Sequence, residues 1–162
     1  MTNEPLFKSV KNKQIVAWDI FGQKHNRWLK DFKFRLSVYG VLKIKNEVLV
    51  QKNLIHSKYG FPGGGVEIDE LIPEGLIREY EEESGLKVRV GKLLGISEDF
   101  FTFRGTDVHG VLIYYEVEKV GGEILPNGNG QDTGEVKFIE IDKLTEETVS
   151  RSQWKFIKNF KF

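Results

Sequence analysis

The spacing of hydrophobic residues predicts a helix over residues 72–84. When successive residues are placed about 100° apart, Leu76 and Tyr80 lie in one apolar stripe that should face the core. Pro73 stands near the start of the segment and Gly85 directly follows its end, an asymmetry that is typical of helices. The boundaries of this helix are therefore marked at both ends by local sequence.

Other segments predict strands, a loop and a second helix. Runs rich in β-branched and aromatic residues are typical of strands, and we expect them over residues 34–44, 48–51, 87–104, 108–118 and 136–141. The segment 121–134 is rich in glycine and is expected to be a loop. Aromatic and aliphatic residues at helical spacing predict a final helix over residues 150–160.

We assign residues 31–162 to one domain, because domains of about 100–150 residues are the commonest. Residues 1–30 have a less regular pattern and are interpreted as an N-terminal extension. Within it, residues 15–21 are consistent with a strand, and the extension could form a hairpin packed on the domain.

Composition and charge exclude several classes of function. The chain of 162 residues is 40% hydrophobic, and its 24 basic residues equal its 24 acidic ones, so no net positive charge favours nucleic acid or acidic membranes. The absence of cysteine excludes disulfides, thiolate zinc sites and cysteine nucleophiles. We find neither a signal-peptide pattern nor an apolar run of roughly 20 residues. We therefore expect a cytoplasmic protein.

Three carboxylates of the first predicted helix share one face. Glu79, Glu82 and Glu83 fall within a sector about 100° wide, where they repel one another. A divalent cation would remove that repulsion, and oxygen ligands suit Mg²⁺ or Mn²⁺. The alternative is an acidic helix that is merely solvated. However, the three glycines at residues 63–65, the glycine segment, lie directly upstream and would let a phosphate or metal come close to the backbone.

The same sector includes Gly75, which lies between Glu79 and Glu82 on the helical projection. Glycine in a helix costs about 1 kcal/mol relative to alanine, so helix propensity alone does not favour it. We expect a large side chain at Gly75 to crowd the glycine segment or a phosphate bound there, and Gly75→Ala to be nearly silent.

The glycine segment and the helix together resemble the signature of the Nudix hydrolase family. The matching pattern is Gly64-x5-Glu70-x7-Arg78-Glu79-Tyr80-x-Glu82-Glu83-x-Gly85-Leu86. Tyr80 stands where the family usually has an aliphatic residue. Because Tyr80 belongs to the apolar stripe, we expect it to face the core without harm to the site.

The resemblance implies an α/β fold, an α/β/α sandwich with a mixed β-sheet in which the signature forms a loop–helix–loop. It implies a Mg²⁺ or Mn²⁺ cofactor and hydrolysis of a nucleoside diphosphate linked to another moiety. The family's metal ligands match Glu79, Glu82, Glu83 and the carbonyl of Gly63. Its residues that orient the metal-binding glutamates match Glu70 and Arg78.

The catalytic base differs between family members and often lies outside the signature. The candidates here are Glu98, Glu116, Asp132 and Glu135. We select Glu98, because a long strand could carry it over the helix, and Glu82 is the alternative within the signature.

Cationic and aromatic residues beside the signature are candidates for binding substrate. The cationic candidates are Arg35, Lys52 and Arg104, which lie on or beside the predicted strands that flank the signature and could meet phosphates. Phe61 precedes the glycine segment and could stack on a base, with core packing as the equal alternative.

Two other functions are compatible with the same fold. Isomerases of the same fold use an active-site cysteine, which this chain lacks. A nucleotide-binding regulatory domain without catalysis remains the alternative, although such a domain would be expected to lose a ligand glutamate. We thus expect a small-molecule partner, a nucleoside diphosphate derivative, and leave a homodimer open.

Overall fold

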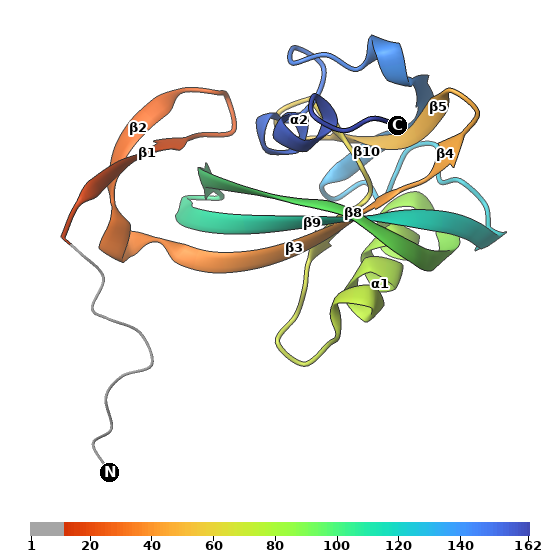
Figure 1. Cartoon of the computed structure of the whole chain (residues 1–162), viewed down its shortest axis with the longest axis horizontal. Helices are drawn as coiled ribbons and strands as arrows, with labels where there is room; N and C mark the ends of the chain where they lie inside the picture. Colours follow the sequence, from red (N-terminus) through yellow and green to blue (C-terminus); the bar gives the residue numbers. More distant parts are fainter. Residues whose placement is uncertain (1–11) are drawn as a thin grey trace.

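The computed structural model describes residues 12–162, which form two β-sheets and two α-helices (Figure 1). The larger sheet has the strand order β2-β1-β8-β9-β3-β7, and the smaller has β10-β5-β4 with β6 paired to β5. The strands are β1 (Gln14–Trp18), β2 (Lys24–Trp28), β3 (Lys33–Val41), β4 (Lys43–Ile44), β5 (Glu47–Asn53), β6 (Tyr59–Gly60), β7 (Gly63–Gly65), β8 (Leu86–Phe103), β9 (Thr106–Gly122) and β10 (Thr133–Glu140).

Helix α1 (Ile72–Ser84) has the predicted boundaries. Glu74 accepts a hydrogen bond from the backbone N–H of Leu71 at 2.8 Å, which satisfies one of the free donors at the helix start. Gly85 ends the helix in a left-handed conformation with φ of 76°, which glycine adopts without steric cost. Local signals alone therefore set the length of this helix.

Helix α2 (Arg151–Ile157) is shorter than the predicted helix over 150–160. After Ile157 the chain continues in tighter turns, and the N–H of Phe160 donates to the carbonyl of Ile157 at 3.2 Å. The ring of Phe160 still stacks on Phe156 with centroids 4.9 Å apart. Its apolar spacing thus reflects packing that extends beyond the helix itself.

The two helices pack on opposite faces of the larger sheet, as the alternation of side chains along β3 demonstrates. Val38 belongs to the apolar cluster that includes Leu76 and Tyr80 of α1. Tyr39, the next residue, packs against the cluster that includes Phe156 of α2. Figure 1 shows α1 below the sheet and α2 above it. The expected α/β/α layering is confirmed.

The larger sheet is mixed, as expected: β3 runs parallel to β9, and β8 runs antiparallel to β9. The predicted strand over 34–44 is divided at Leu42 into β3 and β4. Both β9 and β10 extend into the segment expected to be a loop, which leaves residues 123–132 as the connection. No helix within residues 12–162 is long and apolar enough to cross a membrane.

Strands β1 and β2 form an antiparallel hairpin, and β1 joins the larger sheet through one parallel pairing, Trp18 with Phe101 of β8. In Figure 1 the hairpin curves over the sheet toward α2. The first eleven residues of the expected N-terminal extension lie outside the described residues. The division of the chain at residue 30 stays a prediction.

Candidate functional site

Helix α1, the glycine segment and the N-terminal hairpin border one cleft with a volume of about 570 Å³. Glu79 and Glu83 line it from α1. Further lining residues come from β3, β5, the hairpin turn and the start of α2; they include Arg35, Tyr39, Gln51, Trp18, Phe21 and Arg151. A cleft of this size suits a small organic ligand such as a nucleotide.

Glu83 is the more deeply buried of the two carboxylates, with only 7% of its surface exposed. It accepts hydrogen bonds from the amide of Gln51, from the backbone N–H of Gly63 at 2.9 Å and from the hydroxyl of Thr133 at 3.0 Å. Burial raises the pKa of Glu83 to about 7, although these three donors oppose the shift. Glu83 therefore has a strong tendency to attract a proton or a cation.

The carboxylate of Glu79 lies directly against the glycine segment. A β-carbon at Gly64 would come within 2.6 Å of the Glu79 carboxyl carbon, so a larger residue there would displace this carboxylate. Burial also raises the pKa of Glu79, and its charge in turn raises the pKa of Glu83. The fold thus brings two mutually repelling carboxylates to the base of the cleft.

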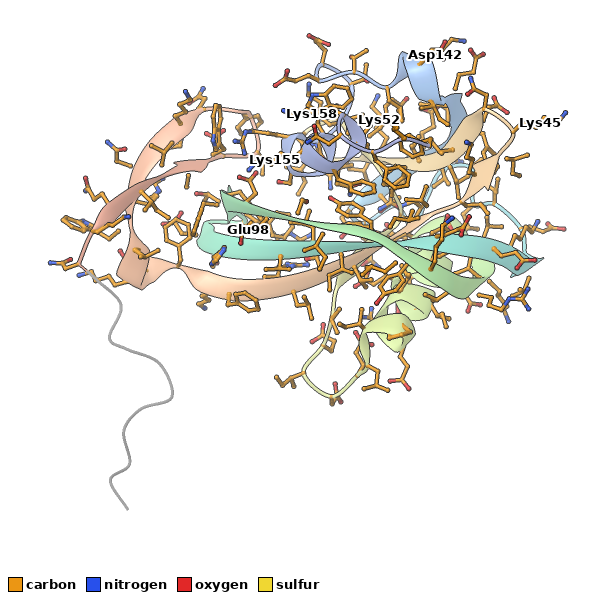
Figure 2. The ribbon with its side chains drawn as sticks, in the orientation of Figure 1. Lys45, Lys52, Glu98, Asp142, Lys155 and Lys158 are labelled. Atoms are coloured by element: carbon orange, nitrogen blue, oxygen red, sulfur yellow. The ribbon has the colours of Figure 1, made fainter. Side chains whose placement is uncertain are left out.

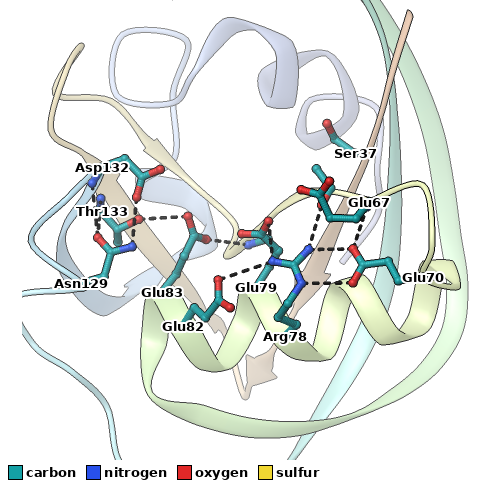
Figure 3. Close-up of polar contacts among 12 residues, drawn as sticks. Ser37, Glu67, Glu70, Arg78, Glu79, Glu82, Glu83, Asn129, Asp132 and Thr133 are labelled. Atoms are coloured by element: carbon teal, nitrogen blue, oxygen red, sulfur yellow. Dashed lines mark hydrogen bonds and ion pairs between the residues drawn. The ribbon is translucent and has the colours of Figure 1, made fainter.

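Arg78 connects the start of α1 to the glutamates (Figure 3). Its guanidinium donates to Glu70 through two bonds of 2.7 and 3.1 Å and to the carbonyl of Gly65 at 3.1 Å. It also lies 3.0 Å from Glu79 and 3.4 Å from Glu82. The hydrogen bond with Arg78 lowers the pKa of Glu70, and Glu70 raises that of Arg78. This network holds α1 against the glycine segment.

The residues at the cleft base offer the oxygen ligands that hard divalent cations prefer. The amide oxygen of Gln51 is buried without a hydrogen-bond partner next to the Glu83 carboxylate. Across residues 12–162, however, no three His, Cys, Asp or Glu side chains are grouped to hold a metal ion as they stand. The reason is geometric: Glu79 and Glu82 turn toward Arg78, whereas Glu83 turns toward Gln51 and Thr133.

The structure does not bring Glu98 to the glutamates of α1. Its side chain is 69% exposed and lies 3.3 Å from His109; Figure 2 shows it near the end of the sheet that carries the hairpin. The neighbouring Asp99 faces the cleft instead, because successive side chains of a strand point to opposite faces.

Of the other candidate bases, only Asp132 borders the cleft. Glu116 is exposed and pairs with Lys92 at 3.5 Å. Glu135 accepts a hydrogen bond from Tyr59 at 2.6 Å.

The four candidate substrate residues occupy different environments. Arg35 lines the cleft, and its guanidinium lies close to Gly65. Lys52 does not line it, although both neighbours on β5 do; its ammonium lies 6.0 Å from the ring of Tyr59. Arg104 lies in the β8–β9 turn, 3.8 Å from Asp132. Among the three candidate cations, Arg35 is therefore the one placed nearest the glycine segment.

Phe61 is fully buried and packs edge-on against Tyr114 at 6.4 Å between ring centroids. Its backbone N–H donates to Gln153 of α2 at 2.7 Å. Core packing is thus the role that the structure gives Phe61, and its ring has no free face for a base.

Sequence reasoning missed the donors that hold Glu83. Gln51 ends an apolar predicted strand, and that polar position was the one available signal. Thr133 lay in the segment expected to be a loop and had no distinguishing signal. Sequence reasoning also missed the ion pair between buried Asp99 and Arg151, the first residue of α2.

Comparison with known proteins identifies the same region. The NUDIX domain profile matches residues 33–160. An ADP-ribose pyrophosphatase of Methanocaldococcus jannaschii is 30% identical over 146 residues, which cover 81% of this chain and 82% of that protein.

Solved structures agree on the fold. A MutT protein of Bacillus halodurans superposes with a TM-score of 0.64 at 24% identity, covering 77% of this chain and 80% of that one. A MutT NUDIX hydrolase of Burkholderia pseudomallei superposes with a TM-score of 0.67 at 18% identity, covering 80% of this chain and 99% of that one. At these identities the likeness concerns the fold alone.

Proposed function

The chain belongs to the Nudix family and is a hydrolase of phosphoric anhydride bonds; from this premise we propose that it is a divalent-metal-dependent pyrophosphohydrolase of a nucleoside diphosphate linked to another moiety. The observation that carries the proposal is the pair of carboxylates at the cleft base beside the glycine segment, the buried Glu83 and the half-buried Glu79. Perturbed carboxylates in a cleft are typical of functional sites.

The ligands we propose for Mg²⁺ or Mn²⁺ are Glu79, Glu82, Glu83 and the carbonyl of Gly63. Such an ion, when bound, neutralises phosphate charge and makes a water more acidic. Arg78, which Glu70 holds, orients Glu79 and Glu82. Gln51, Gly63 and Thr133 orient Glu83. Glu82 has 57% of its side chain exposed and is therefore open to water. We propose that Glu82 accepts the proton of the attacking water.

The diphosphate would lie between the glycine segment and Arg35, whose guanidinium suits two phosphate oxygens at once. Attack of water on one phosphorus breaks the anhydride bond and leaves two phosphate monoesters. ADP-ribose is the first substrate to test, because the relative from Methanocaldococcus jannaschii is named an ADP-ribose pyrophosphatase.

A panel assay tests the proposal. ADP-ribose, nucleotide sugars, nucleoside triphosphates and dinucleoside polyphosphates are incubated with Mg²⁺ or Mn²⁺, and phosphate monoesters are measured. We expect metal-dependent cleavage of at least one compound. Binding without cleavage of any compound would instead support the alternative, a regulatory nucleotide-binding domain. A cytoplasmic location and a homodimer stay predictions.

A further inference from the structure

The end of the cleft away from α1 is lined by aromatic rings. Trp18 and Phe21 come from the N-terminal hairpin, and Phe101 and Phe103 come from β8. The ring of Phe21 is conspicuous, because 73% of the residue's surface is exposed although it borders a cleft. The cleft therefore has an acidic end, formed by α1, and an aromatic end, formed partly by the hairpin.

The hairpin turn holds Phe21 in a defined position. One carboxylate oxygen of Asp19 accepts hydrogen bonds from the backbone N–H groups of Phe21 at 2.9 Å and Gln23 at 2.8 Å. The other oxygen lies 2.9 Å from Nε2 of His25. The Asp19 side chain thus connects Phe21, Gln23 and His25. Because the backbone of the turn is already restricted, less conformational entropy is lost when a ligand binds there.

The turn end of the hairpin is joined to the opposite side of the cleft. The guanidinium of Arg151 lies 4.0 Å from the centroid of the Trp18 ring, and it pairs with buried Asp99. Lys155 also pairs with Asp99, at 2.7 Å. Since Arg151 and Lys155 belong to α2, the hairpin, β8 and α2 form one connected border around the aromatic end.

We propose that this aromatic end binds the nucleobase of the substrate and that Phe21 stacks on it. The inference rests on the proposed function, because the acidic end takes the diphosphate and leaves the aromatic end for the nucleoside. Bases stack on aromatic faces, and Phe61, the sequence-based candidate, is fully buried. Phe21 lies outside residues 33–160, the part matched by the NUDIX profile, so a segment beyond that profile determines which base is accepted.

Binding of nucleoside 5′-monophosphates tests this assignment. They contain no anhydride bond, so their affinity is measured whether or not the protein hydrolyses anything. Isothermal titration calorimetry with Mg²⁺ compares AMP, GMP, CMP and UMP with ribose 5-phosphate, which lacks a base. We expect the parent protein to prefer at least one nucleotide over ribose 5-phosphate, and Phe21→Ala to reduce that preference at least about fivefold.

Two further variants separate stacking from general disturbance. Phe21→Tyr keeps an aromatic face and should retain the preference. Phe34→Ala removes a ring that is 68% exposed but does not line the cleft, and it should change nothing. Equal preference in Phe21→Ala and the parent, or no preference in the parent, would overturn the assignment. Base preference without any hydrolysis in the panel assay would refute the proposed function and leave the base subsite standing.

Discussion

Glu83 is nearly inaccessible to water and accepts three hydrogen bonds. The donors keep the side chain in one position, while burial makes its negative charge costly. Glu79 adds a second negative charge nearby. A bound cation would offset the cost of this negative charge. Glu83 therefore has the properties expected of a metal ligand.

Glu83→Gln separates chemistry from folding. The amide oxygen can still accept from Gly63 and Gln51, and the amide nitrogen can donate to the Thr133 hydroxyl. Because a buried charge is removed, the melting temperature in EDTA should hold or rise. The value of kcat with Mg²⁺ should fall at least about 10²-fold, since a metal contributes several kcal/mol to the transition state.

Glu81→Gln is the matched control for that variant. Glu81 lies on the same helix, is exposed and pairs only loosely with Lys87, at 3.5 Å. Its kcat should equal that of the parent protein. Near-normal kcat in Glu83→Gln would show that Glu83 is not a ligand.

Gly75 faces a different partner from the one expected. A β-carbon there would lie 2.6 Å from the carboxylate of Glu70, not against the glycine segment. Glu70 is held by Arg78 and by the N–H of Glu67 at 2.8 Å, so it cannot move without loosening the Arg78 network. Gly75→Ala should therefore disturb the Arg78 network rather than be nearly silent.

Gly75→Ala should keep or raise the melting temperature, because alanine favours the helix by about 1 kcal/mol. We expect kcat/KM to fall about tenfold or more, since displaced Glu70 no longer holds Arg78, and with it α1, against the glycine segment. Combining it with Glu70→Gln should cost little beyond either change alone, because both act through Arg78. Unchanged kcat/KM in Gly75→Ala would contradict this explanation.

At the scale of elements, α1 meets the sheet through an unusually large side chain. Tyr80 is fully buried, and its ring occupies the space where a β-carbon of Gly40 would be, 2.6 Å from the nearest ring atom. The departure from the aliphatic residue usual in the family is thus matched by a glycine on β3. The Tyr80 hydroxyl is buried without a hydrogen-bond partner, so shape rather than polarity explains the tyrosine.

A double-mutant cycle tests this match. Gly40→Ala should lower the free energy of unfolding by about 1–3 kcal/mol through overpacking, and Tyr80→Leu should lower it through a cavity. The double variant should be more stable than the sum of the two changes implies, because leucine leaves room for the methyl group. Urea unfolding measures all four proteins; strict additivity would refute the match. Tyr80→Phe is the control and should be neutral or stabilising.

At the scale of the whole molecule, the cleft is assembled from parts that are far apart in the chain. The hairpin, both sheets and both helices contribute to it. A ligand that binds the cleft base in the folded state alone therefore stabilises the entire domain.

Mg²⁺ or Mn²⁺ should raise the melting temperature by roughly 5–10 °C at a hundredfold excess over its Kd, the shift that mass action implies for a domain of this size. Excess EDTA should abolish turnover. A Glu79→Gln, Glu83→Gln double variant should lose the thermal shift, and a potassium salt of equal ionic strength controls for screening. Undiminished hydrolysis in excess EDTA would remove the metal mechanism.

Local sequence was sufficient for the features that local physics controls. The boundaries of α1 follow from its apolar stripe, Pro73 and Gly85, and each of these acts within one or two turns. Strands β3, β5, β8, β9 and β10 follow from residue type, whereas the short strands β6 and β7 do not. The shared helix face of Glu79, Glu82 and Glu83 follows from the helical repeat.

The surroundings of each side chain depended on contacts between distant segments. Gln51 and Thr133, which hold Glu83, are 32 and 50 residues away from it in sequence. That Asp99 rather than Glu98 faces the cleft depends on the register of β8 against β9, because a shift of one residue reverses every side chain. The sheets and α2 cover Phe61, whereas Phe21 is left exposed at the cleft. Hydrophobicity alone does not distinguish these two rings.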